Sequence, residues 1–182
     1  MTTLNLIFGA GGIGEGRISH TWTNPEQTNE LLKSLNELGL KQLDSAASYP
    51  PGAAWVTETL LGQTKAAEKG FVIDSKIIPF SIKTGRNPKV KSGAGSLSED
   101  NIDASFKETF ELLGVEKVHI MYAHCSDPDT PAEESARAFD KHLRAGHCEK
   151  VCSHSVYGID GELTRTLAGA VQLQLRGNEG VA

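Results

Sequence analysis

Two side chains capable of acid–base chemistry lie at either end of a short stretch in the first third of the chain. Residues 43–49 read LDSAASY, with Asp44 at the end of a predicted strand and Tyr49 five residues later. The small residues between them allow a tight turn, and Pro50 and Pro51 prevent a helix from starting at once. A carboxylate and a phenol in one turn can exchange protons with a ligand, although an aspartate after a strand can also serve only as a turn residue.

Two more polar residues close predicted strands further along the chain. Lys76 lies in an apolar run at residues 71–78, and His124 follows another run at residues 117–122. An ordinary phenol has a pKa of about 10, and a neighbouring ammonium favours its ionised form. An aspartate can hold that ammonium, while a histidine can hydrogen-bond the same carbonyl oxygen. The set predicts protonation of a carbonyl oxygen, and reduction would require a nicotinamide cofactor because no side chain supplies hydride.

The elements that must position these residues alternate between strand and helix. Strands are predicted at residues 4–8, 41–44, 71–78, 117–122 and 149–152, and helices at residues 25–38, 54–62, 96–113 and 131–144. This alternation predicts a parallel α/β sheet with right-handed crossovers. Active sites of such sheets lie at the carboxyl ends of the strands, so we expect Asp44, Tyr49, Lys76 and His124 to converge there.

Capping residues mark where the predicted helices begin and end. One of residues 23–24 caps the first helix ahead of Pro25, and Ser96 with Glu99 has the spacing of a capping box. Gly62 is predicted to stop the second helix. The first helix is predicted to place all its leucines in the core, namely Leu31, Leu32, Leu35 and Leu38.

Composition restricts the class of partner. The chain of 182 residues has a formal net charge of -5, which gives no electrostatic basis for binding nucleic acid or an anionic membrane. It contains no apolar run near the roughly 20 residues needed to cross a bilayer, and no secretory leader. Its three cysteines are an odd number without disulfide-framework spacing. We expect a cytoplasmic protein whose ligand is a small molecule or another protein.

Three other motifs suggest alternative sites. Residues 9–14 read GAGGIG and fit the dinucleotide pattern G-x-G-x-x-G, so a Rossmann-type nucleotide-binding protein is a lesser alternative. That pattern needs a helix directly after it, whereas the next helix signal is Pro25. The cluster of His147, Cys148, Cys152 and His154 lacks the spacing of a zinc finger, so we predict no metal site there. A Cys125 thiol paired with His124 is disfavoured because adjacent residues seldom face each other.

Taken together, these segments resemble the aldo-keto reductase family, whose fold is the (β/α)8 barrel. Residues 43–49 resemble its aspartate and tyrosine turn, and residues 58–62 (ETLLG) resemble its Glu-x-x-Leu-Gly motif. Residues 73–76 (IDSK) resemble its strand-three lysine motif. Residues 113–124 resemble the passage that ends in its catalytic histidine. Residues 131–134 (PAEE) are most similar in style to the aflatoxin-aldehyde-reductase-like branch.

The resemblance implies NADPH-dependent reduction of aldehydes or ketones to alcohols. It makes Tyr49 the general acid, with Lys76 tuning it and Asp44 anchoring Lys76, and it makes His124 the residue that orients the carbonyl. It further assigns cofactor contacts to Asp44, Ser155 and Gln172, and substrate contacts to Tyr49, His124 and Trp55. It implies a small carbonyl compound as the partner and no metal.

The resemblance extends over residues 4–152, and residues 153–182 diverge from it. The family continues with a Gly-x-Ser-Asn-Tyr type turn, whereas residues 151–157 read VCSHSVY and lack the asparagine. His119 also departs from the family, which usually has an aspartate there. The family's late loop that binds the cofactor pyrophosphate would lie beyond residue 182.

The expected fold is therefore a partial (β/α)8 TIM barrel of the first five or six parallel strands, forming a single truncated domain over residues 1–182. An open sheet has two exposed edges, so we expect self-association through them. Two functions of different class stay open. One is an NADPH-dependent carbonyl reductase, and the other is a catalytically inactive barrel fragment, truncated or misspliced, that acts at most as an interaction partner.

Overall fold

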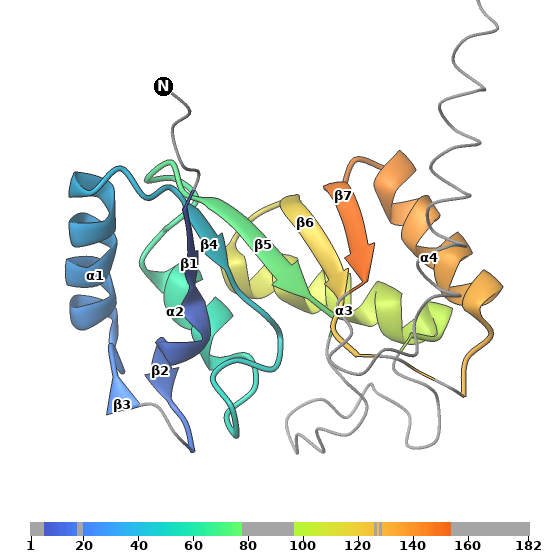
Figure 1. The fold of residues 1–182 in the computed structure, drawn as a ribbon, viewed down its shortest axis with the longest axis horizontal. Coiled ribbons are helices and arrows are strands. Elements are labelled where there is room, and N and C mark those ends of the chain that lie inside the picture. The colour runs from blue at the N-terminus through green and yellow to red at the C-terminus, as the bar shows by residue number, and fades with distance from the viewer. Residues whose placement is uncertain (1–5, 18–19, 78–96, 126, 128, 154–182) are drawn as a thin grey trace, which may run out of the picture.

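A single parallel sheet forms the centre of the molecule (Figure 1). The structure is a computed structural model that describes residues 6–17, 20–77, 97–125, 127 and 129–153. The strands lie in the order β1 (Ile7–Gly9), β4 (Gln42–Asp44), β5 (Val72–Lys76), β6 (Val118–Ala123) and β7 (Cys148–Ser153). Every neighbouring pair is parallel. The predicted parallel α/β architecture is confirmed.

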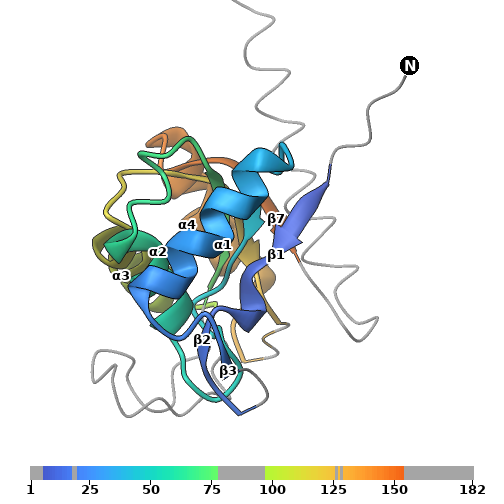
Figure 2. The same cartoon turned by 90° about the vertical axis from the view of Figure 1, so that its left-hand side faces the viewer.

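Four helices cover one face of this sheet (Figure 2). They are α1 (Pro25–Glu37), α2 (Val56–Gln63), α3 (Glu99–Leu113) and α4 (Ala132–Arg144). Leu43 and Ile73 point toward them and join the buried apolar core. Because side chains alternate along a strand, Asp44 and Lys76 point to the opposite face. None of the described helices is long and apolar enough to cross a membrane.

The first helix begins as predicted and ends one residue early. Asn24 caps it by accepting a hydrogen bond from the Gln27 amide at 2.9 Å, and Pro25 occupies its first position. Leu38 was predicted to be core and is instead 74% exposed. It lies at the C-cap, where the chain leaves the helix and turns through Gly39 with φ of +75°, so its side chain no longer follows the apolar stripe.

Two predicted helix boundaries are wrong. α2 begins at Val56 because Trp55 has a left-handed φ of +72°, and it continues past Gly62 to Gln63. A Cβ atom on Gly62 would lie 1.9 Å from the Leu112 carbonyl oxygen, so this glycine lets α2 approach α3 and does not stop the helix.

The predicted Ser96–Glu99 capping box is also wrong, because Ser98 is the N-cap of α3 and Glu99 is its first residue. The Glu99 carboxylate lies 2.7 Å from Lys141 Nζ on α4 and does not reach back to the cap. Ser96 itself lies outside the described residues. The contact of Glu99 with Lys141 therefore links α3 to α4, where the spacing in the sequence predicted a cap within one helix.

The glycine-rich segment after β1 enters an antiparallel pair and not a helix. A short 3-10 turn, η1 (Ala10–Gly12), leads to β2 (Gly14–Glu15), which pairs with β3 (His20–Thr21). The Rossmann alternative is therefore wrong, because the glycines lead into a 3-10 turn and an antiparallel pair, and no α-helix begins before α1 in the described part of the chain. The glycines allow close packing instead: a Cβ on Gly16 would lie 2.7 Å from the Pro51 carbonyl oxygen, and one on Gly14 would lie 2.6 Å from a Val56 methyl.

Candidate active site

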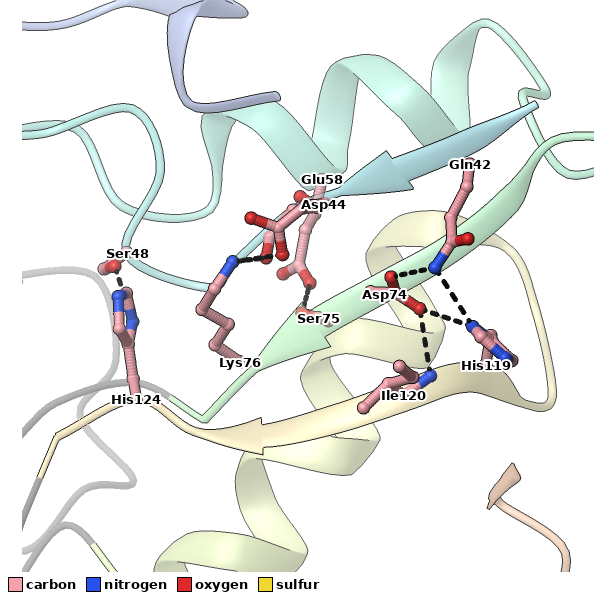
Figure 3. Close-up of polar contacts among 11 residues, drawn as sticks. Gln42, Asp44, Ser48, Glu58, Asp74, Ser75, Lys76, His119, Ile120 and His124 are labelled. Atoms are coloured by element: carbon pink, nitrogen blue, oxygen red, sulfur yellow. Dashed lines mark hydrogen bonds and ion pairs between the residues drawn. The ribbon is translucent and has the colours of Figure 1, made fainter. Parts of the chain in front are cut away.

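The carboxyl ends of three neighbouring strands bring the predicted site residues together. Asp44 is the last residue of β4, Lys76 is the last residue of β5, and His124 directly follows β6. Tyr49 lies in the turn that leaves β4. Figure 3 shows Asp44, Lys76 and His124 at the carboxyl ends of their strands. The predicted convergence of the four residues is confirmed by the contacts between their side chains.

Lys76 is the buried centre of this group. The residue is 3% exposed, and its Nζ donates to Asp44 Oδ1 at 2.6 Å and to the Ser45 carbonyl oxygen at 2.7 Å. The Asp44 side chain keeps about a third of its surface exposed, at 35%. A buried ammonium is stable only when paired and hydrogen-bonded, and these two acceptors meet that need. The site therefore holds a fixed positive charge beneath its open surface.

Two phenol rings flank the Lys76 ammonium. Its Nζ lies 4.7 Å from the centroid of the Tyr49 ring and 5.7 Å from that of Tyr122. Burial raises the pKa of Tyr122, and the nearby Asp74 carboxylate raises it further. The Tyr49 ring also meets the His124 ring edge to face, with centroids 5.8 Å apart. Tyr49 thus lies between a cation and an imidazole.

Ser48 was not singled out by sequence reasoning. Its Oγ lies 3.1 Å from His124 Nδ1, which links the turn after β4 to the end of β6 (Figure 3). The hydrogen bond fixes the orientation of the imidazole relative to Tyr49, the residue that follows Ser48. The only signal in the sequence was the position of Ser48 inside the small-residue turn.

A second polar group lies on the same face of the sheet as Lys76 but further from the carboxyl ends of the strands. Asp74 is buried, and its Oδ1 lies 2.8 Å from His119 Nδ1 and accepts the Ile120 amide at 3.1 Å. Its Oδ2 accepts from Gln42 Nε2 at 2.6 Å. His119, which departs from the family pattern, therefore partners a buried carboxylate. This pairing could not be predicted from sequence, since its residues lie on three strands that are far apart in the chain.

Glu58 lies behind the site, on the helix-covered face of the sheet. It is fully buried, and its carboxylate accepts hydrogen bonds from Ser75 Oγ at 2.6 Å and Thr109 Oγ1 at 3.5 Å (Figure 3). Burial raises its pKa to about 7, against the lowering effect of those two hydroxyls. Ser75 directly precedes Lys76, so Glu58 ties the end of β5 to α2 and α3.

Other predicted residues lie elsewhere. Trp55 is 5% exposed and packs against Ala47, Ala54 and Leu112, and its indole nitrogen has no hydrogen-bond partner among the described residues. Its predicted contact with substrate stays a prediction. Ser155 and Gln172, predicted to bind cofactor, lie outside the described residues, as do His154 and the predicted sixth strand.

The cysteines differ in their surroundings. Cys125 is exposed, whereas Cys148 is buried and burial raises the pKa of its thiol to about 12. Among the described residues, no group of three or more His, Cys, Asp or Glu side chains is arranged so that it could hold a metal ion. A buried thiol with a raised pKa is a poor nucleophile, so Cys148 is structural.

Comparisons with known proteins show the family of this chain. The model of the aldo/keto reductase family matches residues 5–156. A putative voltage-gated potassium channel subunit beta from Schizosaccharomyces pombe is 30% identical over 121 residues, which are 66% of this chain and 34% of that protein. An aldo-keto reductase from Pseudocercospora fijiensis is 27% identical over 131 residues, 71% of this chain and 40% of that protein.

A solved structure shares the fold. The holo form of an aldo-keto reductase from Bacillus halodurans superposes with a TM-score of 0.64 at 20% sequence identity, covering 84% of this chain and 46% of that one. The chain thus spans less than half the length of these relatives. The predicted kinship with the aflatoxin-aldehyde-reductase-like branch is not tested by these matches and stays a prediction.

Proposed function

The chain belongs to the aldo/keto reductase family, and from that premise we propose that its site reduces aldehydes or ketones to alcohols with NADPH, with Tyr49 as the general acid. One observation carries the proposal. The buried Lys76 ammonium is hydrogen-bonded to Asp44 and lies over the Tyr49 ring. The His124 ring, directly after β6, meets the same ring edge to face. A phenol, an ammonium and an imidazole together suit a carbonyl oxygen that gains negative charge.

Each residue has a distinct part in the proposed reaction. Tyr49 donates its phenolic proton to the carbonyl oxygen, and the Lys76 ammonium stabilises the charge that this leaves on the phenol. Asp44 holds Lys76 in place through the 2.6 Å contact. His124, oriented by Ser48, donates a hydrogen bond to the carbonyl oxygen and positions it for protonation. When bound, the nicotinamide supplies the hydride.

The described residues suit a cofactor at the strand ends. Asp44 is the charged side chain of the group that keeps an accessible face, so we assign it a cofactor contact in addition to its bond with Lys76. We retain Ser155 and Gln172 as predicted cofactor contacts. The four site residues include acids, a base and hydrogen-bond donors but no hydride donor, which is the role left for NADPH.

The relatives are longer than this chain, so the activity is proposed for the protein that carries this site. We treat residues 1–182 as one domain of it. The catalytically inactive fragment is the less favoured alternative, because a chain without a reaction to perform has no evident use for a buried lysine held beside a tyrosine. Exposed Cys125 suits a reducing compartment, which supports the proposed cytoplasmic location.

A reduction assay tests the proposal. Purified protein is mixed with NADPH and 4-nitrobenzaldehyde, and loss of NADPH is followed by absorbance. We expect turnover that falls by about a hundredfold or more in Tyr49→Phe, as for loss of a general acid. Tyr122→Phe is the matched control, since it removes the other phenol near Lys76 and should retain activity. Equal rates for the wild type and Tyr49→Phe would refute the role of Tyr49.

A further inference from the structure

A pocket lies at the end of the sheet opposite to the candidate active site. Its walls come from the turn between α3 and β6 and from the turn between α4 and β7, that is, from the amino ends of those strands. Its volume is about 660 Å³, within the range of small-molecule sites. Phe110 and Val115 supply an apolar wall, while Glu116, Lys117 and His147 bring polar groups.

A chain of three hydrogen-bonded side chains ends at this pocket. Asp103 Oδ1 lies 2.8 Å from His142 Nε2, and His142 Nδ1 lies 2.8 Å from His147 Nδ1. His142 is buried and stacks on Phe106 with ring centroids 3.8 Å apart. Burial lowers the pKa of His142, with opposing contributions from Asp103, so its ring is neutral near pH 7.

These distances fix the proton positions. A carboxylate oxygen accepts only, so Nε2 of the neutral His142 carries its proton toward Asp103, and its Nδ1 must be an acceptor. Nδ1 of His147 therefore donates to His142. In the neutral form of His147 the remaining nitrogen, Nε2, carries a lone pair and points away from the buried His142. Because His147 lines the pocket and its Nδ1 is used by His142, Nε2 is the ring nitrogen that the neutral residue can offer to a ligand as an acceptor.

The electrostatics of the pocket favour a positive ligand. α3 ends at Leu113 and α4 ends at Arg144, so the carboxyl ends of both helices lie beside the pocket, and such ends carry partial negative charge. Glu116 adds a carboxylate. The last turn of α4 also carries Lys141 and Arg144, and each lies beside a carboxylate: Lys141 lies within 2.8 Å of both Glu99 and Asp103, and Arg144 lies 2.7 Å from Asp140. Lys117, on the pocket wall, lies 3.3 Å from Glu149.

We propose that this pocket binds a small organic cation, an ammonium group attached to an apolar body. Its N–H donates to His147 Nε2, its charge is offset by Glu116 and the two helix ends, and its apolar part packs on Phe110 and Val115. The ring of Phe110 adds a cation–π contribution. The site is separate from the proposed reductase chemistry, so either can exist without the other.

The test uses two probes of the same shape and opposite charge. Benzylamine and benzoate are titrated near neutral pH into the full chain, and the side-chain nitrogens of its histidines are followed by ¹⁵N NMR. We expect His142 to carry its proton on Nε2 and His147 on Nδ1. Benzylamine should shift His147 Nε2 saturably and give NOEs to Phe110, whereas benzoate should do neither.

Variants localise the binding. His147→Phe keeps an aromatic ring but removes the acceptor, and should weaken benzylamine binding about tenfold or more, as expected for one hydrogen bond to a charged donor. Glu116→Gln should weaken it severalfold, while the matched control Glu111→Gln, an exposed change on α3, should leave it unchanged. Binding of benzoate at least as tight as benzylamine, no saturable shift with either probe, or unchanged affinity in His147→Phe would overturn the proposal.

Discussion

At the scale of single residues, Lys76 holds the proposed site together. The residue is 3% exposed, and its ammonium donates hydrogen bonds to Asp44 and to the Ser45 carbonyl oxygen while it lies over the Tyr49 ring. Because this ammonium is buried, water does not screen its effect on the Tyr49 phenol. Replacing it should therefore affect the proposed chemistry more strongly than replacing any exposed lysine.

Lys76→Met tests this role. The variant keeps the length of the side chain but removes the ammonium, so we expect NADPH-dependent reduction to fall by about a hundredfold, the scale of one lost electrostatic contact at a reacting atom. Lys41→Met is the matched control, because Lys41 also lies over an aromatic ring, that of Phe71 at 5.4 Å, but away from the site. Comparable losses in both variants would mean that Lys76 acts only through folding.

Glu58 makes stability depend on pH. Its pKa is raised from 4.5 to about 7 in the folded chain, so folding favours the protonated carboxyl. Its contribution to stability is fully present below about pH 4.5 and is lost as pH rises toward 7, amounting to about 3 kcal/mol over that window. Glu58→Gln should remove this slope while keeping an acceptor for Ser75.

Urea unfolding of the wild type and of Glu58→Gln from pH 5 to pH 8 measures the difference. Groups whose pKa is shifted elsewhere, such as His142, contribute equally to both proteins and cancel. Glu37→Gln, an exposed change on α1, is the control and should leave the wild-type slope intact. If the wild type and Glu58→Gln have parallel pH profiles, the Glu58 carboxyl is not protonated on folding.

Sequence reasoning at this scale found side chains at strand ends and missed those at strand middles and under helices. Asp44, Lys76 and His124 each close a strand, and topology alone brings such positions together. The contact of Asp74 with His119 and that of Glu58 with Ser75 depend on the register of neighbouring strands and on how deeply α2 packs. Neither register nor packing depth can be read from one strand's pattern.

At the scale of elements, the close contact of α2 with α3 positions the helix layer behind the site. There is no room for a Cβ atom on Gly62, because it would lie 1.9 Å from the Leu112 carbonyl oxygen. Glu58, one helical turn earlier on α2, bonds Ser75 on β5 and Thr109 on α3. The spacing between the helices thus sets how Glu58 reaches the end of β5.

Gly62→Ala should force the two helices apart. We expect a loss of about 1–3 kcal/mol in the free energy of unfolding, the usual cost of overpacking, measured by urea denaturation. Gly9→Ala is the matched control, since a Cβ there meets nothing within 4 Å. A Gly62→Ala variant as stable as the wild type would show that α2 and α3 are not held at this distance.

The types and order of the elements could be predicted, and their ends less well. Alternating apolar runs and helical periodicity located all five main strands and four helices. The errors at Gly62 and Glu99 share one cause: each residue was assigned from local spacing, while its contacts are made with a neighbouring helix. Leu38 is exposed for a local reason, because it lies at the C-cap where the chain turns through Gly39. The antiparallel pair of β2 and β3 was missed because its strands are two residues long.

At the scale of the whole molecule, β1 and β7 are the outer strands of the sheet formed by the described residues. The β1 edge is apolar, with Leu6 56% and Ile7 49% exposed. Exposed apolar edges of parallel sheets pair with other chains unless they are covered. We therefore expect the 182-residue chain to self-associate through these edges.

Sedimentation velocity over a range of concentrations tests this expectation. The wild type should show a mass that rises with concentration, and Ile7→Lys, which places a charge on the edge strand, should shift it toward the monomer. Leu38→Lys removes an even more exposed apolar residue on the helix side, 74% against 49% for Ile7, and should not change the association. A wild type that stays monomeric throughout would contradict pairing through β1.

The sequence predicted a partial barrel, and the described sheet is five parallel strands with helices on one face. Long-range closure of such a sheet is not encoded in any single segment, and the matched part of this chain covers only 34% and 40% of two curated relatives. The four proposed acid–base residues nevertheless all come from the ends of β4, β5 and β6 and from the turn after β4. This is why their geometry followed from strand ends alone.

The most direct test of the central proposal is transfer of a labelled hydride. The protein is given NADPH deuterated at the transferable position together with 4-nitrobenzaldehyde, and the alcohol product is analysed by mass spectrometry. We predict one deuterium per molecule of alcohol with the wild type, and product formation strongly reduced with Tyr49→Phe. Absence of labelled alcohol with the wild type, or its formation at equal rates with Tyr49→Phe, would contradict the account.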